Sequence, residues 1–162
     1  MNNILFLCTG NSARSILAEY IVNSLGDGRW QAYSAGSTPT GVVNPYAVTI
    51  LKLLGYDGVE NARSKSWDEF TGEDAPVMDL VVTLCDQAAG ETCPIWHGTP
   101  LQLHWGFPDP AAETDDKAAR GAFMDVYEDI RRFAGVLVDV LPGEHDSASL
   151  HRYIKARMKT AA

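Results

Sequence analysis

The chain has 162 residues, of which 46% are hydrophobic and 21% are charged, and its formal net charge is −8. Such a length and composition are typical of one globular domain with its own core. The negative net charge, without any block of basic residues, argues against a nucleic-acid partner. The apolar runs are too short to cross a bilayer and the first residues lack the positive charge of a signal peptide, so we expect a cytoplasmic protein that makes no membrane contact.

The first predicted elements are a buried strand at residues 4–7 and a helix whose apolar side chains recur from Ile16 to Leu25. Cys8 lies on the short loop between them. Backbone amides of such a loop and of the first helical turn can converge on an anion, and the guanidinium of Arg14 can close over a tetrahedral oxyanion. The same positive field lowers the pKa of a thiol, so the loop predicts a Cys8 thiolate beneath an oxyanion site.

Three further strands are predicted at residues 30–35, 79–84 and 101–104. Because a helix connects the first two strands of the chain, these two should be parallel. Ligands of open α/β sheets bind beyond the carboxyl ends of the strands. Cys8 and Cys85 each follow a strand directly, so we expect both at the same edge of the sheet.

Four helices are predicted after the first one, including a short helix within residues 61–70 that is capped by Ser64 or Ser66. Residues 44–45 are Asn-Pro, which is a typical helix start. The apolar spacing predicts a long amphipathic helix at residues 116 to about 141 and a final helix at residues 147 to about 158. We predict one domain over residues 1–142, with residues 143–162 as a helical extension of that same domain.

An odd number of cysteines and the lack of a signal peptide argue against structural disulfides among Cys8, Cys85 and Cys93. From the residues alone, Cys85 and Cys93 are either small buried side chains or a redox pair. Asp109 lies between two prolines after the last strand, which holds its carboxylate on a stiff loop. It is either a turn residue or an acid catalyst.

Cys85, Cys93 and His97 also lie near one another in the sequence. Their Cys-x7-Cys-x3-His spacing is not a usual zinc pattern, and a fourth ligand is not evident. Histidines are more often surface or packing residues than bases, and we expect such roles for all four: His97, His104, His145 and His151.

Residues 8–15, Cys-Thr-Gly-Asn-Ser-Ala-Arg-Ser, resemble the signature loop of the low-molecular-weight protein tyrosine phosphatase fold family, and most of all its thioredoxin-coupled arsenate reductases. The other matching segments extend to the end of the long helix: Ser34-Ala35-Gly36, Val43-Asn44-Pro45, Val82-Thr83-Leu84-Cys85, Cys93-Pro94, His104-Trp105-Gly106 and Asp109-Pro110. This resemblance implies a three-layer α/β/α fold with a central four-stranded parallel sheet. It also implies an oxyanion site made of Thr9, Gly10, Asn11, Ser12, Ala13, Arg14 and Ser15.

The resemblance further implies the reduction of arsenate to arsenite, a reaction of arsenic detoxification. Cys8 would attack arsenic while Asp109 protonates the departing oxygen. Cys85 would then attack Cys8 and release arsenite, and Cys93 would attack Cys85. A thioredoxin or glutaredoxin would reduce the resulting Cys85–Cys93 disulfide.

Two other functions are compatible with the same loop. The main alternative is a phosphatase that acts through a phosphocysteine at Cys8, with Asp109 as acid and then base. A phosphatase has no use for Cys85 and Cys93, and the residues after Asp109 offer no aromatic ring to a phosphotyrosine. A regulator that only binds an oxyanion or senses redox state would not need Asp109.

Lys65 departs from the resemblance. Members of the reductase branch that bind potassium have a carboxylate at this position, whereas Asn11, Glu19 and Ser34 match their other side chains. A lysine ammonium could replace the cation. We therefore expect no metal and no cofactor, with a potassium ion as the alternative.

Overall fold

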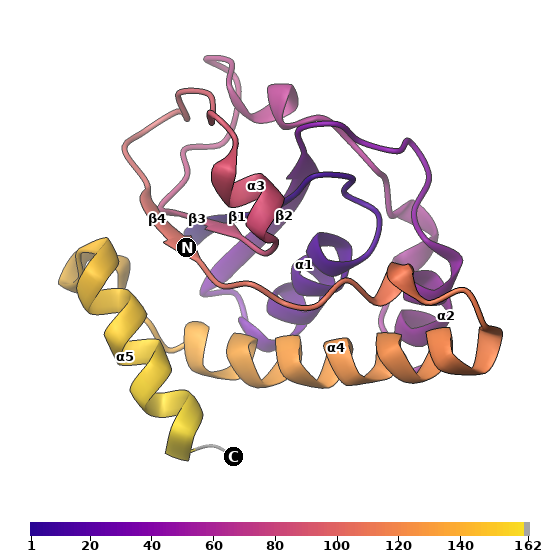
Figure 1. The fold of residues 1–162 in the computed structure, drawn as a ribbon. Coiled ribbons are helices and arrows are strands. Elements are labelled where there is room, and N and C mark those ends of the chain that lie inside the picture. The colour runs from indigo at the N-terminus through magenta and orange to yellow at the C-terminus, as the bar shows by residue number, and fades with distance from the viewer. Residues whose placement is uncertain (161–162) are drawn as a thin grey trace.

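The computed structural model describes residues 1–160. Its centre is a parallel sheet of four strands in the order β2-β1-β3-β4 (Figure 1). The strands are β1 (Asn2–Cys8), β2 (Trp30–Gly36), β3 (Leu80–Thr83) and β4 (Leu101–His104). The α/β fold with a four-stranded parallel sheet is therefore confirmed.

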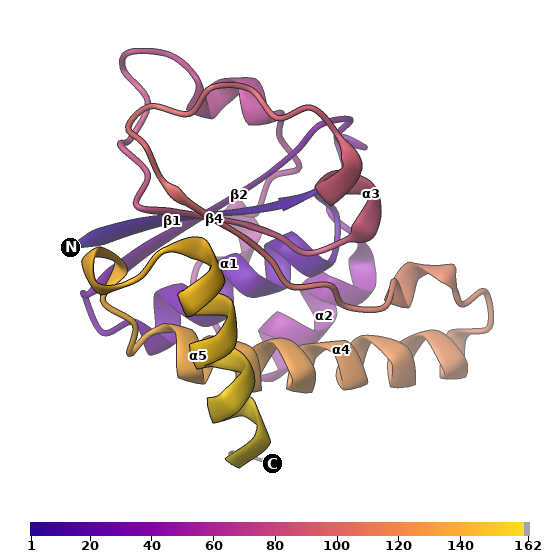
Figure 2. The same ribbon diagram turned by 60° about the vertical axis from the view of Figure 1, so that its left-hand side comes forward.

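Four helices cover one face of this sheet, as Figures 1 and 2 show from two sides. They are α1 (Arg14–Leu25), α2 (Pro45–Leu53), α4 (Asp116–Leu137) and α5 (Ser147–Thr160). The long helix α4 packs across α1, and α5 contacts both α4 and the edge strand β4. This face contains the larger hydrophobic core.

Both faces of β1 are buried, as expected for a central strand of a parallel sheet. Ile4 and Phe6 point into the core beneath the four helices, whereas Leu5 and Leu7 pack into a smaller cluster on the opposite face. Short and irregular segments, including the 3₁₀ helix that ends at Phe70, cover that opposite face. The layer on this side is therefore thin. It leaves the carboxyl ends of the strands close to the surface.

The remaining helices are short. They are η1 (Val59–Asn61), η2 (Trp67–Phe70), α3 (Asp86–Gly90), η3 (Pro110–Ala112) and η4 (Pro142–Glu144). The α3 helix was not predicted, because its five residues are too few to show a helical period. It begins directly after Cys85, whose sulfur accepts a hydrogen bond from the amide of Ala88 at 3.4 Å.

The long helix α4 ends at Leu137, about one turn earlier than predicted. The indole of Trp30 donates a hydrogen bond of 3.2 Å to the carbonyl of Val138, which is one of the free carbonyls at this helix end. The chain then turns, and Val140 becomes buried. An amphipathic pattern alone cannot distinguish this buried turn from another turn of helix.

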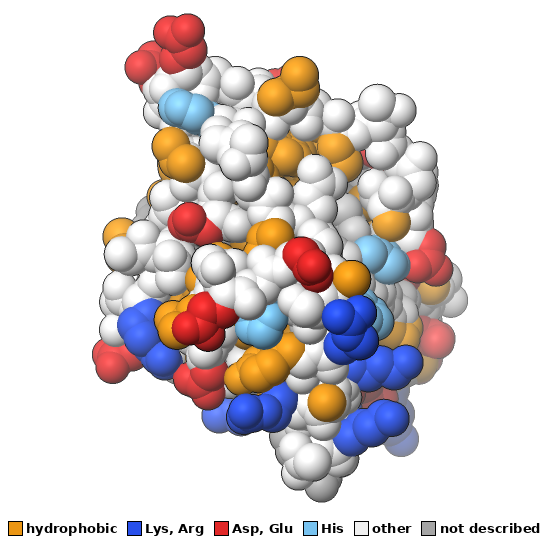
Figure 3. Space-filling model, turned by 90° about the vertical axis from the view of Figure 1, so that its left-hand side faces the viewer, with side chains coloured by type: hydrophobic (Ala, Val, Ile, Leu, Met, Phe, Trp, Pro, Cys, Tyr) orange, Lys and Arg blue, Asp and Glu red, His pale blue; other side chains and the backbone are white. Residues whose placement is uncertain are grey.

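The final helix α5 inserts Leu150 and Ile154 fully into the larger core. This burial supports the proposal that residues 143–160 belong to the same domain as residues 1–142; residues 161–162 lie outside the described part. Figure 3 shows the face over α5, where basic side chains gather, including Arg157 and Lys159 of its last turn. Within residues 1–160, no helix has the length and apolar character needed to span a membrane.

Candidate functional site

The carbonyl groups of the loop between β1 and α1, residues 9–13, accept hydrogen bonds from another segment of the chain. The amides of Thr38, Thr40 and Asn44 donate to the carbonyls of Thr9, Gly10 and Ser12 at 3.0, 3.0 and 2.9 Å. Within residues 1–160, the amides of residues 10–14 donate to no protein acceptor. The N-terminus of α1 also lacks a side-chain cap. These free amides at a helix start are suited to bind an anion.

Asn11 fixes the shape of the loop from within. Its backbone has a φ of 45°, a left-handed conformation that asparagine tolerates better than most residues, and its side chain is fully buried. The side-chain amide donates to the Ser15 hydroxyl at 2.8 Å, and its oxygen accepts from the Lys65 amide at 2.8 Å. Asn11 and Ser15 therefore shape the loop rather than face the cleft.

A cleft of about 370 Å³ opens over this loop. Its lining includes Cys8 and Cys85 and, at the rim, Arg14 and Asp109. The guanidinium of Arg14 donates to the Phe107 carbonyl at 2.9 Å and lies 4.0 Å from the Asp109 carboxylate. The Arg14 side chain is only 14% exposed and Asp109 is 51% exposed, so the cation is held in place while the carboxylate reaches solvent.

Cys8 and Cys85 pack together with Ala88 in a small buried cluster, although 77 positions separate them in the sequence. A hydrogen bond from the Cys8 thiol, helped by the amides of Ala88 and Thr9, lowers the pKa of Cys85 to about 5. The same contact and burial raise the pKa of Cys8, against the opposing effect of Arg14. The pair therefore holds one negative charge, which the two sulfurs share.

The sequence-based prediction of a Cys8 thiolate considered only the field of the loop and of Arg14, both of which do favour a thiolate at Cys8. In the fold, a second thiol touches Cys8, and two adjacent thiolates repel each other. Without an oxyanion, the two sulfurs therefore share one proton, and the thiolate at Cys8 stays a prediction.

Cys93 lies outside this cluster. It is partly exposed and packs against the smaller hydrophobic cluster on the thin side of the sheet. Burial and the carboxylate of Glu91 raise the pKa of its thiol. All three cysteines are free. The fold thus brings two of the three predicted thiols together and keeps the third on the neighbouring segment after α3.

The comparison with known proteins agrees with this arrangement. Residues 3–147 match the family described as low molecular weight phosphotyrosine protein phosphatase. An arsenate reductase of Halalkalibacterium halodurans is 43% identical over 78% of this chain and 88% of that protein. An arsenate reductase of Bacillus subtilis is 42% identical over 78% of this chain and 86% of that protein. The chain belongs to the arsenate reductase branch of this family.

The fold of this branch is also found among solved structures. A structure described as an arsenate reductase in the phosphate binding state matches with a TM-score of 0.63 and 26% identity, over 83% of this chain and 97% of that chain. The similarity in sequence and structure therefore extends over most of the chain.

The ammonium of Lys65 lies among side-chain oxygens behind the loop. It is 3.6 Å from the Glu19 carboxylate and 3.4 Å from the Ser34 hydroxyl, which itself donates to Glu19. Burial raises the pKa of Glu19, and Lys65 and Ser34 counteract this effect. The backbone amide of Lys65 binds Asn11, so this cluster is directly joined to the loop.

The other candidates have structural contacts. The ring of His104 contacts Thr83 and Asp86, and His97 contacts the carbonyl of Ala75. His145 contacts Ser149, and His151 packs on Trp105. Within the described residues, no three side chains among His, Cys, Asp and Glu lie close enough to hold a metal ion.

Sequence reasoning missed three residues at the site. Asp86 and Gln87 line the cleft because α3 begins directly after Cys85. The Thr9 hydroxyl contacts Glu91, a residue 82 positions away. The acidic residue two positions before Cys93 was visible in the sequence, but only the fold shows that it reaches the oxyanion loop.

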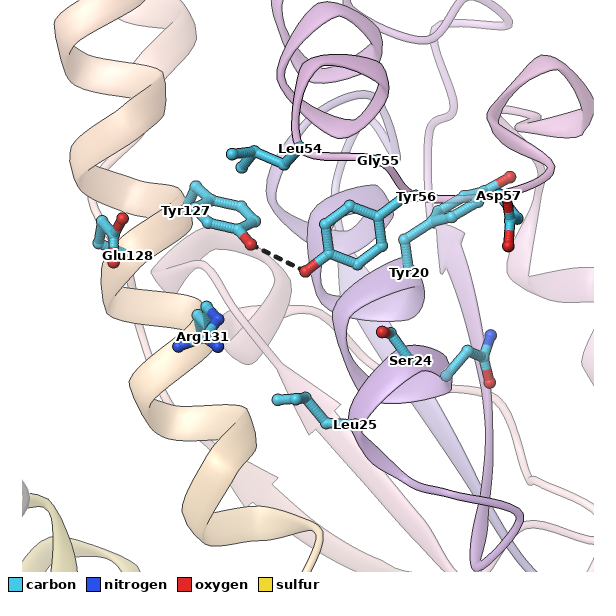
Figure 4. Close-up of a pocket in the computed structure, with 11 residues that line it drawn as sticks. Tyr20, Ser24, Leu25, Leu54, Gly55, Tyr56, Asp57, Tyr127, Glu128 and Arg131 are labelled. Carbon is cyan, nitrogen blue, oxygen red and sulfur yellow. Dashed lines mark hydrogen bonds between the residues drawn. The ribbon is translucent and has the colours of Figure 1, made fainter.

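A second hollow, of about 710 Å³, lies between α1, α4 and the turn at residues 54–57 (Figure 4). The hydroxyls of Tyr56 and Tyr127 are hydrogen-bonded at 2.8 Å across it. Arg131 and Glu128 of α4 also line it. Its lining contains no thiol, so this hollow is separate from the cysteine chemistry.

Proposed function

We propose that this chain reduces arsenate to arsenite through its three cysteines. The observation that carries the proposal is the buried contact between Cys8 and Cys85 at a cleft with free loop amides. A phosphatase needs one nucleophile at this place. A second thiol in contact with the first is useful only if the two form a disulfide.

In the first step, the loop amides and Arg14 bind arsenate, and Arg14 favours the thiolate form of Cys8. The Cys8 sulfur, which transfers its proton within the thiol pair, bonds to arsenic. One arsenic–oxygen bond breaks, and the departing oxygen takes a proton from Asp109. The 4.0 Å separation between Arg14 and Asp109 supports this role, because both groups can then reach the same oxyanion.

In the second step, the Cys85 sulfur attacks the Cys8 sulfur, and the proton that Cys85 received from Cys8 passes to an oxygen of the departing arsenite. The Cys8–arsenic bond breaks and its electron pair stays on arsenic, which leaves as arsenite. In the third step, the Cys93 thiolate attacks Cys85, so that Cys8 departs as a thiolate and the disulfide moves to Cys85–Cys93. The partial exposure of Cys93 suits this step, because a partner must reach the final disulfide.

We further propose a thioredoxin or glutaredoxin as the reductant, because a dithiol partner supplies the two electrons that arsenic has gained. Such a cycle requires cysteines that are reduced at rest, which supports a location in the cytoplasm. The proposed oxyanion ligands are the amides of residues 9–15 and the side chain of Arg14. The phosphate-binding state named for the similar solved structure supports a tetrahedral oxyanion here.

The test is arsenite formation from arsenate with thioredoxin, thioredoxin reductase and NADPH, run beside aryl phosphate hydrolysis. We expect Cys8→Ser to abolish both activities. Cys85→Ser should abolish arsenite release but retain any hydrolysis. Cys93→Ser should produce about one arsenite per enzyme and then stop with a Cys8–Cys85 disulfide, which mass spectrometry detects.

Each serine variant thus serves as a control for the others. Full turnover in both Cys85→Ser and Cys93→Ser would exclude the thiol relay. Fast aryl phosphate hydrolysis without any arsenate reduction would instead establish the phosphatase function.

A further inference from the structure

The hydroxyl of Thr9 contacts two groups at once. It donates a hydrogen bond to the Glu91 carboxylate at 3.4 Å and lies 3.8 Å from the sulfur of Cys85. Thr9 directly follows Cys8 in the oxyanion loop, and Glu91 lies two residues before Cys93. This hydroxyl therefore connects the loop that binds the oxyanion with the segment that carries the last thiol.

A threonine hydroxyl has a single proton to donate. A carboxylate and a thiolate are both acceptors, so the Thr9 proton can stabilise Glu91 or the Cys85 thiolate, but not both. The Thr9 hydroxyl is one of the groups that lower the pKa of Cys85, and its hydrogen bond to Glu91 draws on the same proton. Glu91 thus competes with Cys85 for the same proton.

Glu91 also acts on Cys93. This thiol packs against the smaller hydrophobic cluster on the thin side of the sheet. After burial, the carboxylate of Glu91 is the cause that raises the pKa of Cys93. The carboxylate therefore opposes negative charge on Cys93 and competes for one hydrogen bond of the Cys85 thiolate.

We propose that Glu91, bound to Thr9, keeps Cys93 in a less reactive state until an oxyanion occupies the loop. The proposal rests on the thiol relay described above. An oxyanion bound to the loop amides brings negative charge next to Thr9, and like charges at such short range repel. Glu91 then separates from Thr9, the Thr9 proton turns to Cys85, and Cys93 loses its anionic neighbour.

With this arrangement, oxyanion binding precedes the reaction of Cys93. If a peroxide oxidised Cys85 and Cys93 to a disulfide before arsenate binds, with the two electrons passing to the peroxide, reductant would be consumed without reducing arsenic. The carboxylate suppresses that reaction in the free enzyme. Among the other charged groups of the cleft, Arg14 favours the oxyanion, while Asp86 and Asp109 add to the negative field that opposes thiolates.

The experiment uses inorganic phosphate, a tetrahedral oxyanion that cannot be reduced. The rate of alkylation of Cys93 by iodoacetamide is measured on the full chain by peptide mass spectrometry, with and without phosphate. Protection of Cys8 from the same reagent reports that phosphate is bound. We expect phosphate to accelerate the labelling of Cys93 by about three- to tenfold in the wild type, as expected for loss of one nearby like charge.

In Glu91→Gln, the alkylation rate of Cys93 without phosphate should equal the rate in the wild type with phosphate. Phosphate should have no further effect on this variant. Thr9→Val should show the same insensitivity, whereas Thr9→Ser, which restores a hydroxyl, should respond to phosphate. Glu73→Gln is the matched control, because it removes the same charge from an exposed residue that makes no hydrogen bond or ion pair within residues 1–160. It should behave as the wild type.

If phosphate protects Cys8 but leaves the labelling of Cys93 unchanged or slower, the role of Glu91 is refuted and the arsenate reductase activity is untouched. Equal labelling rates for Glu91→Gln and the wild type without phosphate refute it as well. Failure of phosphate to protect Cys8 at any concentration would overturn both this inference and the oxyanion site. Absence of arsenate reduction, by contrast, would refute the proposed function alone.

Discussion

Gly36 is the residue through which strand β2 touches the oxyanion loop. Replacing it with alanine would push the loop backbone from the side of β2. A Cβ atom at this position would lie 2.4 Å from the Thr9 carbonyl oxygen and 3.0 Å from both the Asn11 nitrogen and the Cys8 oxygen. All three neighbours are backbone atoms. The shortest contact is roughly 1 Å below ordinary van der Waals separation, so either the loop or the strand must move by about that amount.

Two effects of Gly36→Ala can be separated. Overpacking at a rigid site costs ~1–3 kcal/mol, which urea unfolding measures as a lower midpoint. A displacement of ~1 Å at catalytic groups can reduce the rate about 100-fold. We therefore expect kcat/KM for arsenate, corrected for the folded fraction, to fall by about 10- to 100-fold, together with weaker phosphate binding.

Gly135→Ala is the matched control. Gly135 lies on the exposed face of α4, where a Cβ atom would meet nothing within 4 Å. In a helix interior, alanine is favoured over glycine, so this variant should be more stable by ~0.5–1 kcal/mol and fully active. If Gly36→Ala loses stability but keeps wild-type kcat/KM per folded molecule, close packing at Gly36 does not position the loop.

Two further variants test the charges of the site. Cys8→Ala removes the main donor to the Cys85 thiolate, so the pKa of Cys85 should rise from about 5 toward the ordinary thiol value. The alkylation of Cys85 near neutral pH should then slow by roughly 30-fold. An alkylation profile that still has its midpoint near pH 5 would contradict the shared proton. Lys65→Met leaves Glu19 buried without its cation and should destabilise the fold by about 3 kcal/mol at neutral pH. Because burial raises the pKa of Glu19, protonation at lower pH neutralises it, so the loss should shrink as pH falls. Urea unfolding at several pH values measures this loss of unfolding free energy. Arg29→Met is the control: it removes an exposed ion pair with Asp139 and should cost at most ~1 kcal/mol at every pH.

Much of the site follows from local sequence. The apolar run before Cys8, the small and polar residues of the loop, and Arg14 six positions later are sufficient to predict an anion site at a helix start. The helix start at Asn44-Pro45 could likewise be predicted, because the Asn44 side chain caps that helix through the amide of Tyr46 at 2.9 Å. These features depend on hydrogen bonds and periodicities that span only a few residues.

The short helix α3 and the early end of α4 could not be predicted in this way. The first has too few residues to show a period. The second depends on Trp30, which is more than 100 positions from the carbonyl that it binds. Long-range contacts of this kind leave no trace in the local pattern, so residues 138–140 looked like a continuing helix.

The sequence by itself determined the α/β architecture, the oxyanion loop and the three thiols, because each is encoded by residues adjacent in the chain. Only the tertiary structure decided how charge is distributed among those thiols. It brings Cys85 against Cys8, where two thiolates cannot coexist, and it brings Glu91 to Thr9, where a single proton must serve two acceptors. Electrostatic and hydrogen-bond energies depend on distance in space, and the order of residues in the chain does not contain that distance.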